Sequence, residues 1–270
     1  MRRRRTKKIT TTSSNKYVLA GLTLSSALVF SRPIIPAIAY ATDANKYIWT
    51  KQGLDLIGGE SINKAASSAN GSSLIASSFD FSGNDPDEPY PLYVSGNYGT
   101  NWQNVAEAAD PGVANYWISV DISNDGQTMV AISTDGYDLD GGEGQQDIPG
   151  KVVLSRNAGA SWSDITPDIP LENGGESFVV VSGDGSTIAA TNGDSGGEVY
   201  ITEDGGTNWV TQVPVGGEGI YPTSLSISDN GDKLLMSGMA GSGSEFDSVY
   251  ITEDGGTNWT GINPFTTDMY

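Results

Sequence analysis

Carboxylates are the side chains of this sequence best placed to do chemistry, and they gather in two glycine-containing stretches. The members are Asp85, Asp87 and Glu88 in the first stretch and Asp135, Asp138, Asp140 and Glu143 in the second. In the second stretch the oxygen ligands lie close enough together to suit Ca²⁺ at the millimolar levels found outside cells, although this stretch departs from the EF-hand pattern. Asp138, Asp140 and Glu143, or the three acidic residues of the first stretch, are also candidates for the two catalytic carboxylates of glycoside cleavage. The simpler alternative is a set of solvated loop charges.

The sequence contains no cysteine and no histidine. The absence of cysteine excludes disulfides, thiol catalysis and cysteine-based zinc sites. The absence of histidine excludes Ser-His-Asp and Cys-His catalysis, and with them the histidine-based metal sites. Calcium is therefore the one cofactor that the composition suggests.

The first 41 residues differ from the rest and are typical of a secretory signal peptide. They begin with MRRRRTKK, continue with an apolar run over Tyr17–Phe30 and end in Ala39-Tyr40-Ala41, a spacing of small residues that a signal peptidase accepts. The apolar run is shorter than the roughly 20 residues that cross a bilayer, which argues against a retained anchor. We expect a secreted protein, extracellular or at the cell surface, with no membrane contact after cleavage.

The chain after this segment, residues 42–270, is strongly acidic. It carries 6 Lys and Arg against 33 Asp and Glu, a net charge of −27. Such a surface repels nucleic acid and anionic lipid, so nucleic-acid partners are excluded. Cation binding is compatible with this charge, but a solvated acidic coat explains it equally well.

Eleven residues, VYITEDGGTNW, occur twice without substitution, at Val199–Trp209 and Val249–Trp259. Two weaker relatives, VSGNYGTNW and LSRNAGASW, occur earlier in the chain. All four place Ser or Thr seven residues before a Trp and Gly three residues before it. The four sets are Ser95, Asn97, Gly99 and Trp102; Ser155, Asn157, Gly159 and Trp162; Thr202, Asp204, Gly206 and Trp209; and Thr252, Asp254, Gly256 and Trp259.

A second motif alternates with the first: an Asn-Gly or Asp-Gly turn between alternating apolar residues, which is the strongest short-range signal of a β-hairpin. Its glycines are Gly71, Gly126, Gly185 and Gly231. The distance from each Trp to the next turn glycine is nearly constant, at 22 to 24 residues, whereas the distance onward to the next Trp varies from 24 to 36. We therefore expect four strands per unit, with insertions confined to the connection between the second and third strands.

Units of about 50 residues with four short antiparallel strands match the blades of a β-propeller. The expected fold is all-β, a propeller-type array of about four four-stranded antiparallel blades, and a β-solenoid is the alternative. The repeat domain covers 42–270, with units at about 51–106, 107–166, 167–213 and 214–270. Trp49 lies at the constant distance before the first turn and so marks an extra strand. An incomplete ring, a compact four-bladed ring and an oligomer formed through open edges all remain possible.

The pattern Ser/Thr-x-Asp-x-Gly-x-x-Trp resembles the Asp-box, the bacterial neuraminidase repeat. This repeat occurs in sialidases, xyloglucanase-type glycoside hydrolases, sortilin-like receptors and photosystem assembly factors. Two copies match it fully, and the other two carry Asn97 and Asn157 at the Asp position. The resemblance implies a β-propeller in which the box shapes the hairpin between a blade's last two strands, away from the catalytic mouth. It implies fold rather than chemistry.

The residue types of the repeated motif suit a structural task. The Asp or Asn side chain can accept backbone N–H bonds within the turn, and the Gly can adopt a positive φ. The Ser or Thr hydroxyl can tie the end of the preceding strand, and the Trp can bury a large ring between neighbouring sheets.

Sialidase chemistry requires several arginines, because the guanidinium fork grips the substrate carboxylate bidentately. The chain after the signal segment has one arginine, Arg156, inside a repeated turn, which argues against sialidase activity. A xyloglucanase-type hydrolase acting on neutral polysaccharide needs only two carboxylates and is the alternative function. The favoured function is a scaffold, without enzymatic activity, that binds an extracellular glycan or protein.

Aromatic residues in the acidic insertions, Tyr90 and Tyr137, are the candidates for ligand contact. The remaining aromatics of this group are expected to fill the core between blades or the rims. They are Tyr93, Tyr98, Tyr116, Trp117 and Tyr221.

Overall fold

The computed structural model describes residues 61–79, 90–111, 113–138, 147–167, 177–193, 196–214, 219–240 and 248–262. The chain divides into two units, Met1–Gln52 and Gly53–Tyr270, and every described residue belongs to the second unit. The predicted signal peptide and Trp49 lie outside the described residues. Within the described ranges, no helix is long and apolar enough to cross a membrane.

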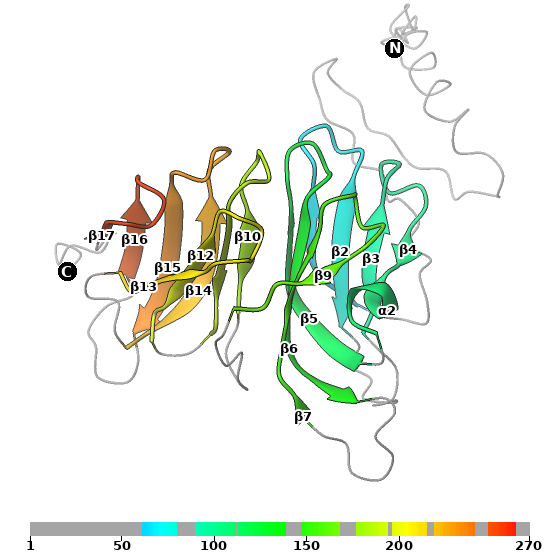
Figure 1. The fold of residues 1–270 in the computed structure, drawn as a ribbon, viewed down its shortest axis with the longest axis horizontal. Helices are drawn as coiled ribbons and strands as arrows, with labels where there is room; N and C mark the ends of the chain where they lie inside the picture. The colour runs from blue at the N-terminus through cyan, green and yellow to red at the C-terminus, as the bar shows by residue number, and fades with distance from the viewer. Residues whose placement is uncertain are drawn as a thin grey trace, which may run out of the picture. The chain divides into compact units, whose positions relative to one another are not determined.

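The described chain forms four antiparallel sheets that follow one another along the sequence (Figure 1). The first sheet contains β1 (Ser61–Ser67), β2 (Leu74–Phe79), β3 (Leu92–Ser95) and β4 (Gln103–Asn104). The second contains β5 (Val113–Ile122), β6 (Met129–Asp138), β7 (Asp147–Ile148), β8 (Val152–Ser155) and β9 (Ser163–Asp164). The third contains β10 (Val179–Val181), β11 (Ile188–Thr191), β12 (Val199–Thr202) and β13 (Val210–Gln212). The fourth contains β14 (Ile220–Ile227), β15 (Leu234–Ala240), β16 (Ser248–Thr252) and β17 (Trp259–Ile262).

This topology confirms the expected all-β, propeller-type array of antiparallel blades. Each Asn-Gly or Asp-Gly turn joins the first two strands of a sheet, and each Trp motif joins the last two. The variable insertions fall between the second and third strands of the four-stranded path, as the spacing predicted. One turn of helix, α2 (Ala106–Ala109), follows the first sheet.

The second sheet is more extensive than the sequence predicted. β6 continues through Asp138, which pairs with Val113 of β5. The short strand β7 pairs with β6 from the other side, at Gly136 and Tyr137. Asp135, Tyr137 and Asp138 therefore belong to a strand and not to a loop. Pairing on both sides explains the difference, because tertiary context overrides the weak strand propensity of Asp and Gly.

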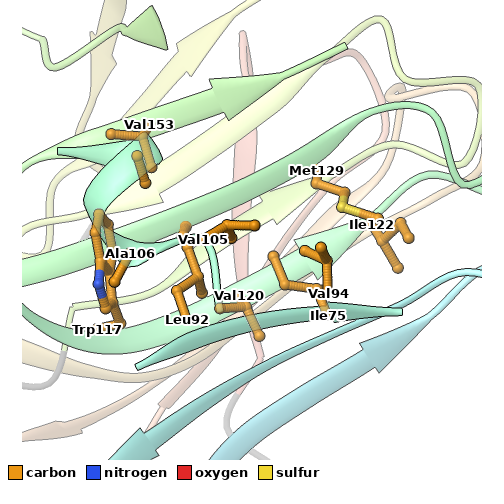
Figure 2. Close-up of a cluster of buried hydrophobic side chains, with 12 residues drawn as sticks. Ile75, Leu92, Val94, Val105, Ala106, Trp117, Val120, Ile122, Met129 and Val153 are labelled. Carbon is orange, nitrogen blue, oxygen red and sulfur yellow. The ribbon is translucent and has the colours of Figure 1, made fainter. Parts of the chain in front are cut away.

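Apolar side chains fill the space between successive sheets in three clusters. Figure 2 shows the cluster between the first two sheets, where Ile75 and Leu92 lie near Val120 and Met129. Residues alternate along each strand, as expected of a strand buried on both faces. Met129 and Ala131 of β6 join this first cluster, whereas Val130 and Ile132 join the cluster shared with the third sheet.

Backbone hydrogen bonds also tie the hairpin turns of successive sheets together. The amide of Ala69 donates to the carbonyl of Asn124 at 2.9 Å, and the amide of Asn124 donates to the carbonyl of Gly183 at 2.8 Å. The amide of Asp184 donates to the carbonyl of Asp229 at 2.8 Å. The sheets are thus linked by apolar packing along their faces and by backbone bonds at their hairpin ends.

The doubled glycine of VYITEDGGTNW meets a backbone requirement. The residue before the motif glycine has a positive φ in every copy, 59° at Tyr98, 55° at Ala158, 72° at Gly205 and 67° at Gly255. This conformation costs a side-chain-bearing residue about 1–2 kcal/mol. The two identical copies therefore avoid a strain that the two weaker copies retain.

Opposite stability changes are expected from Tyr98→Gly and Gly255→Ala. Tyr98→Gly should raise the free energy of unfolding by about 1 kcal/mol, because it relieves the backbone strain and the Tyr98 side chain is 61% exposed. Gly255→Ala should lower it by a similar amount, since the nearest atom to an added Cβ is Glu203 Oε1 at 3.7 Å and no clash contributes. Urea denaturation of both variants measures this, and two changes of the same sign would contradict the explanation.

Candidate functional site

The repeated Trp motifs form closed hydrogen-bonded turns. In the third sheet, the Thr202 hydroxyl donates to Asp204 Oδ1 at 2.9 Å and accepts from the Gly206 amide at 3.0 Å. Asp204 Oδ1 also accepts from the Asn208 amide at 2.9 Å. Equivalent bonds occur in the other three turns, within Ser95, Asn97 and Gly99; Ser155, Asn157 and Gly159; and Thr252, Asp254 and Gly256. These polar groups bind their own turn, which leaves them little capacity for a ligand.

Hydrogen bonding also keeps the carboxylates of these turns ionised. Bonds from Asn208 hold the pKa of Asp204 below its ordinary value, and bonds from Asn258 do the same for the pKa of Asp254. A carboxyl group with a lowered pKa is a poor proton donor near neutral pH. Asp204 and Asp254 are therefore poor candidates for the acid of glycoside cleavage.

The tryptophans of the repeated turns pack between sheets. Trp162, Trp209 and Trp259 each join the apolar cluster between their own sheet and the preceding one. Trp209 Nε1 donates to the carbonyl of Ile165, which follows the last strand of the second sheet, at 2.9 Å. Trp102 belongs to the first sheet, and its buried Nε1 has no hydrogen-bond partner in the described part of the chain.

Of the acidic residues predicted as ligand or catalytic groups, the structure describes only two, and only their backbones. The backbones of Asp135 and Asp138 lie in β6, but their side chains are outside the description. All the remaining members lie outside the described residues: Asp85, Asp87, Glu88, Asp140 and Glu143. The described residues hold no group of three His, Cys, Asp or Glu side chains that could bind a metal. Calcium binding and a carboxylate pair in these stretches stay predictions.

One predicted ligand-contact residue, Tyr90, lies against another tyrosine. Its ring centroid is 4.3 Å from that of Tyr116, with the two planes 31° apart. Tyr90 precedes β3 of the first sheet and Tyr116 lies on β5 of the second, so the pair links the two blades. Both side chains are partly exposed. The backbone of Tyr137 pairs with Ala114, two residues before Tyr116, and the Tyr137 side chain is not described.

The first strands of the four sheets together line a cavity of about 320 Å³, which we call the inner cavity. Its size is near the lower end of the range for small-ligand pockets. The residues that line it come from β1, β5, β14, and β10 with the residue before it. They are Ala65, Ala66, Ser119, Val120, Asp121, Phe178, Val179, Val180, Leu225, Ser226 and Ile227.

Asp121 is the one ionisable side chain among these lining residues. Its Oδ2 accepts a hydrogen bond from the amide of Val181 at 2.9 Å. Burial raises the pKa of Asp121, although backbone hydrogen bonds from Val181 and Ile122 oppose the rise. Lys64 Nζ lies 5.7 Å from the ring centroid of Phe178, another lining residue. The inner cavity thus combines apolar side chains and two serines, Ser119 and Ser226, with one carboxyl group whose pKa is raised.

Asp121 is not among the site residues predicted from the sequence, yet the repeat contains a signal for it. The position five residues before each turn glycine holds Ala66, Asp121, Val180 and Ser226, and all four line the inner cavity. A carboxylate at a position that is otherwise small or apolar is a departure from the repeat. Comparing equivalent positions between units would have singled it out.

Asp121→Asn is expected to stabilise the protein at neutral pH. The folded-state pKa of Asp121 lies above its ordinary value of 3.8, so the ionised form opposes folding. The variant's advantage in the free energy of unfolding should be greatest above the folded-state pKa of Asp121. It should shrink as the pH drops toward 3.8. Thermal melts of the variant between pH 7 and pH 4 measure this.

Glu203→Gln is the matched control, because it removes the same charge from an exposed side chain of the third sheet. If the stabilisation came only from reduced repulsion between surface carboxylates, both variants would be stabilised equally. An Asp121→Asn gain no larger than that of Glu203→Gln at pH 7 would contradict the raised pKa.

Comparison with known proteins supports the fold class. No protein-family model matches the sequence, and no curated protein sequence matches it. The structure resembles a GH74 enzyme from Niastella koreensis with a TM-score of 0.54 at 16% identity, over 75% of this chain and 30% of that one. It resembles TolB from Acinetobacter baumannii with a TM-score of 0.50 at 15% identity, over 77% of this chain and 45% of that one.

Both of these structures are β-propeller proteins, and this chain spans less than half the length of either. The four-stranded sheets and these similarities together define an open, propeller-type array of blades. At such low identity the similarity establishes the fold alone.

Proposed function

We propose that this protein is a secreted β-propeller scaffold that binds an extracellular glycan or protein through its inner cavity. The observation that carries the proposal is the convergence of the first strands of four sheets on a cavity with one carboxylate, Asp121. Binding sites typically combine apolar side chains with a few well-placed polar groups, and both kinds line this cavity. In this proposal the four repeated turns are Asp-boxes that hold the blades together, and the signal-like segment at 1–41 directs the chain out of the cell.

Asp121 would supply specificity to the cavity. As a carboxylate it accepts hydrogen bonds from sugar hydroxyls or from an ammonium group, and bonds to a charged acceptor are worth about 1.5–3 kcal/mol. Ser119 and Ser226 line the same cavity and can add weaker polar contacts. The Tyr90–Tyr116 pair, which lies outside this lining, offers aromatic faces that could extend the contact with a longer glycan.

A glycoside hydrolase of the xyloglucanase type is the second candidate, and the raised pKa of Asp121 favours it. A raised pKa makes a carboxyl group a better general acid for glycoside cleavage. The reaction also needs a second carboxylate, roughly 5–9.5 Å away depending on the mechanism. The described lining of the inner cavity contains no second carboxylate. One of Asp138, Asp140 and Glu143 would have to supply it.

A panel of neutral polysaccharides, oligosaccharides and peptides, scored for binding and for product release, tests the proposal. Binding without product is expected for at least one member. Asp121→Asn should weaken that binding about tenfold or more, the equivalent of roughly 1.4 kcal/mol, and Glu203→Gln should leave it unchanged. Release of a cleaved product would favour the hydrolase. Equal binding by Asp121→Asn and the unmodified protein would contradict a role for the inner cavity.

A further inference from the structure

The polar side chains that β5 places in the inner cavity are already bonded to the backbone of β10. The Ser119 hydroxyl accepts from the Val179 amide at 3.3 Å and donates to the Val179 carbonyl at 3.4 Å. Asp121 Oδ2 accepts from the Val181 amide at 2.9 Å. The hydroxyl proton of Ser119 is therefore in use, whereas the carboxylate of Asp121 keeps lone pairs for further donors. These two side chains have acceptor capacity left for a ligand and no donor.

We infer that the inner cavity takes an ammonium group on an aliphatic chain, namely the lysine side chain of a protein partner. The inference rests on the proposed function and narrows its ligand from a glycan or protein to a protein with an exposed lysine. Ala65, Val120 and Val180 line the cavity and can pack against the aliphatic stem of a lysine. Asp121 is partly exposed and can accept from the ammonium group. Such charged pairs form bonds about twice as strong as neutral ones.

A guanidinium group fits this carboxylate less well than an ammonium group does. Arginine pairs best with a carboxylate when each of the two oxygens receives an N–H of the fork. Asp121 Oδ2 is held by the Val181 amide, so the fork would have to share that oxygen. A lysine ammonium is a compact charge with three rotatable donors, and a single oxygen is enough to bind it. The cavity therefore favours lysine over arginine.

Carboxylates also follow three of the strands that line the cavity. Asp125 follows β5, Asp184 follows β10 and Asp229 follows β14, each in the turn that begins where the strand ends. Hydrogen bonds, first from the serine hydroxyl two residues earlier, hold the pKa of Asp125 and the pKa of Asp184 below the ordinary value. Both side chains are therefore ionised at neutral pH. Fixed negative charge beside the cavity, in a chain of net charge −19, attracts a basic partner and repels an acidic one.

Calorimetric titration with matched peptides tests the inference on the unmodified protein. Three N-acetylated, C-amidated pentapeptides of the form Gly-Gly-X-Gly-Gly carry lysine, Nε-acetyl-lysine or norleucine at X, so that only the first has an ammonium group. The lysine peptide should bind about tenfold or more tightly than either neutral peptide. Asp121→Asn should abolish this preference, and Glu203→Gln, the control at an exposed position, should retain it. The comparison of the three peptides needs no variant, so it holds even if Asp121→Asn fails to fold.

Lys64 provides a second test, of the sign of the ligand's charge. Its Nζ lies 5.7 Å from the ring centroid of Phe178, and both Phe178 and the neighbouring Ala65 line the cavity. Lys64 should therefore repel an ammonium ligand and attract an anionic one. Lys64→Met should raise the affinity for the lysine peptide about twofold. Lys233→Met, which removes the same charge from the exposed pair with Glu253, should change the affinity less. A lower affinity in Lys64→Met would overturn the inference.

Neutral oligosaccharides, titrated in parallel, separate this inference from the proposed function. An oligosaccharide that binds and is weakened by Asp121→Asn, together with a lysine peptide that does not bind, would overturn the inference and leave the proposed function standing. The absence of binding by every peptide and every oligosaccharide would contradict both. Equal affinities for the lysine and Nε-acetyl-lysine peptides would overturn the inference, because the ammonium group would then contribute nothing.

Discussion

Gly231→Ala should lower the free energy of unfolding by about 3 kcal/mol. Two costs combine at this position. Gly231 has a φ of 79°, which costs alanine about 1–2 kcal/mol. A Cβ would also lie 2.2 Å from Oγ1 and 2.7 Å from Cβ of Thr187 in the third sheet. Thr187 is buried and β-branched, so it cannot turn away, and the forced separation of the two sheets costs about another 1–3 kcal/mol.

Gly71→Ala separates these two costs. Gly71 occupies the same turn position in the first sheet with a φ of 73°, but nothing lies within 4 Å of an added Cβ. Its expected loss is the backbone strain alone, about 1 kcal/mol. Chemical denaturation of both variants gives the difference directly. Equal losses would show that the turn glycines serve backbone conformation and not the approach of one sheet to the next.

Trp259→Ala should cost about 3–5 kcal/mol, as expected for removal of a buried aromatic side chain. Trp259 is 9% exposed and belongs to the cluster between the third and fourth sheets. Its Nε1 also donates to the carbonyl of Gly256 at 2.9 Å. Loss of this ring should loosen the fourth sheet from the third, which limited proteolysis would detect as earlier cleavage within residues 219–262.

Trp259→Phe is the control for the hydrogen bond. It keeps most of the ring and removes the Nε1 donor, so the expected loss is near 1 kcal/mol. A loss as large as that of Trp259→Ala would mean that the turn, and not the packing between sheets, depends on the tryptophan. Little loss from Trp259→Ala would contradict the structural role of the repeated motif.

The fold was predictable because the repeat encodes it locally. Turn glycines such as Gly126 and Gly185 mark hairpins through backbone conformations that glycine adopts most readily. The nearly constant distance from each Trp to the next turn then gives four strands per unit. The extension of β6 through Asp138 was not predictable, because it depends on pairing with β5 and β7. That pairing is a tertiary effect that residue types alone do not reveal.

The candidate site was harder to predict for a related reason. The carboxylates predicted as site residues lie in clusters, whereas the inner cavity is lined by a single carboxylate. Asp121 lies next to a turn motif, beside the exposed and hydrogen-bonded Asp125, and nothing in its immediate sequence marks it as buried. Only the assembly of β5 with the first strands of the other sheets brings it to a cavity. Its equivalents, Ala66 and Val180, show that the position faces inward.

Thr202 and Asp121 are expected to have different roles, the first in the stability of the fold and the second in ligand binding. Thr202 is 1% exposed and its hydroxyl serves the repeated turn, as its equivalents do in the other three sheets. Asp121 has no carboxylate equivalent in any other sheet. The repeated residues should therefore control stability, and this unrepeated residue should control binding.

Calorimetric titration of Thr202→Val and Asp121→Asn with a ligand from the panel tests this division most directly. Thr202→Val should lower stability by about 1–3 kcal/mol, because the partly buried Gly206 amide loses its acceptor. The folded variant should bind with unchanged affinity. Asp121→Asn should remain at least as stable as the unmodified protein and bind about tenfold or more weakly. Weaker binding by folded Thr202→Val, with unchanged binding by Asp121→Asn, would contradict the account.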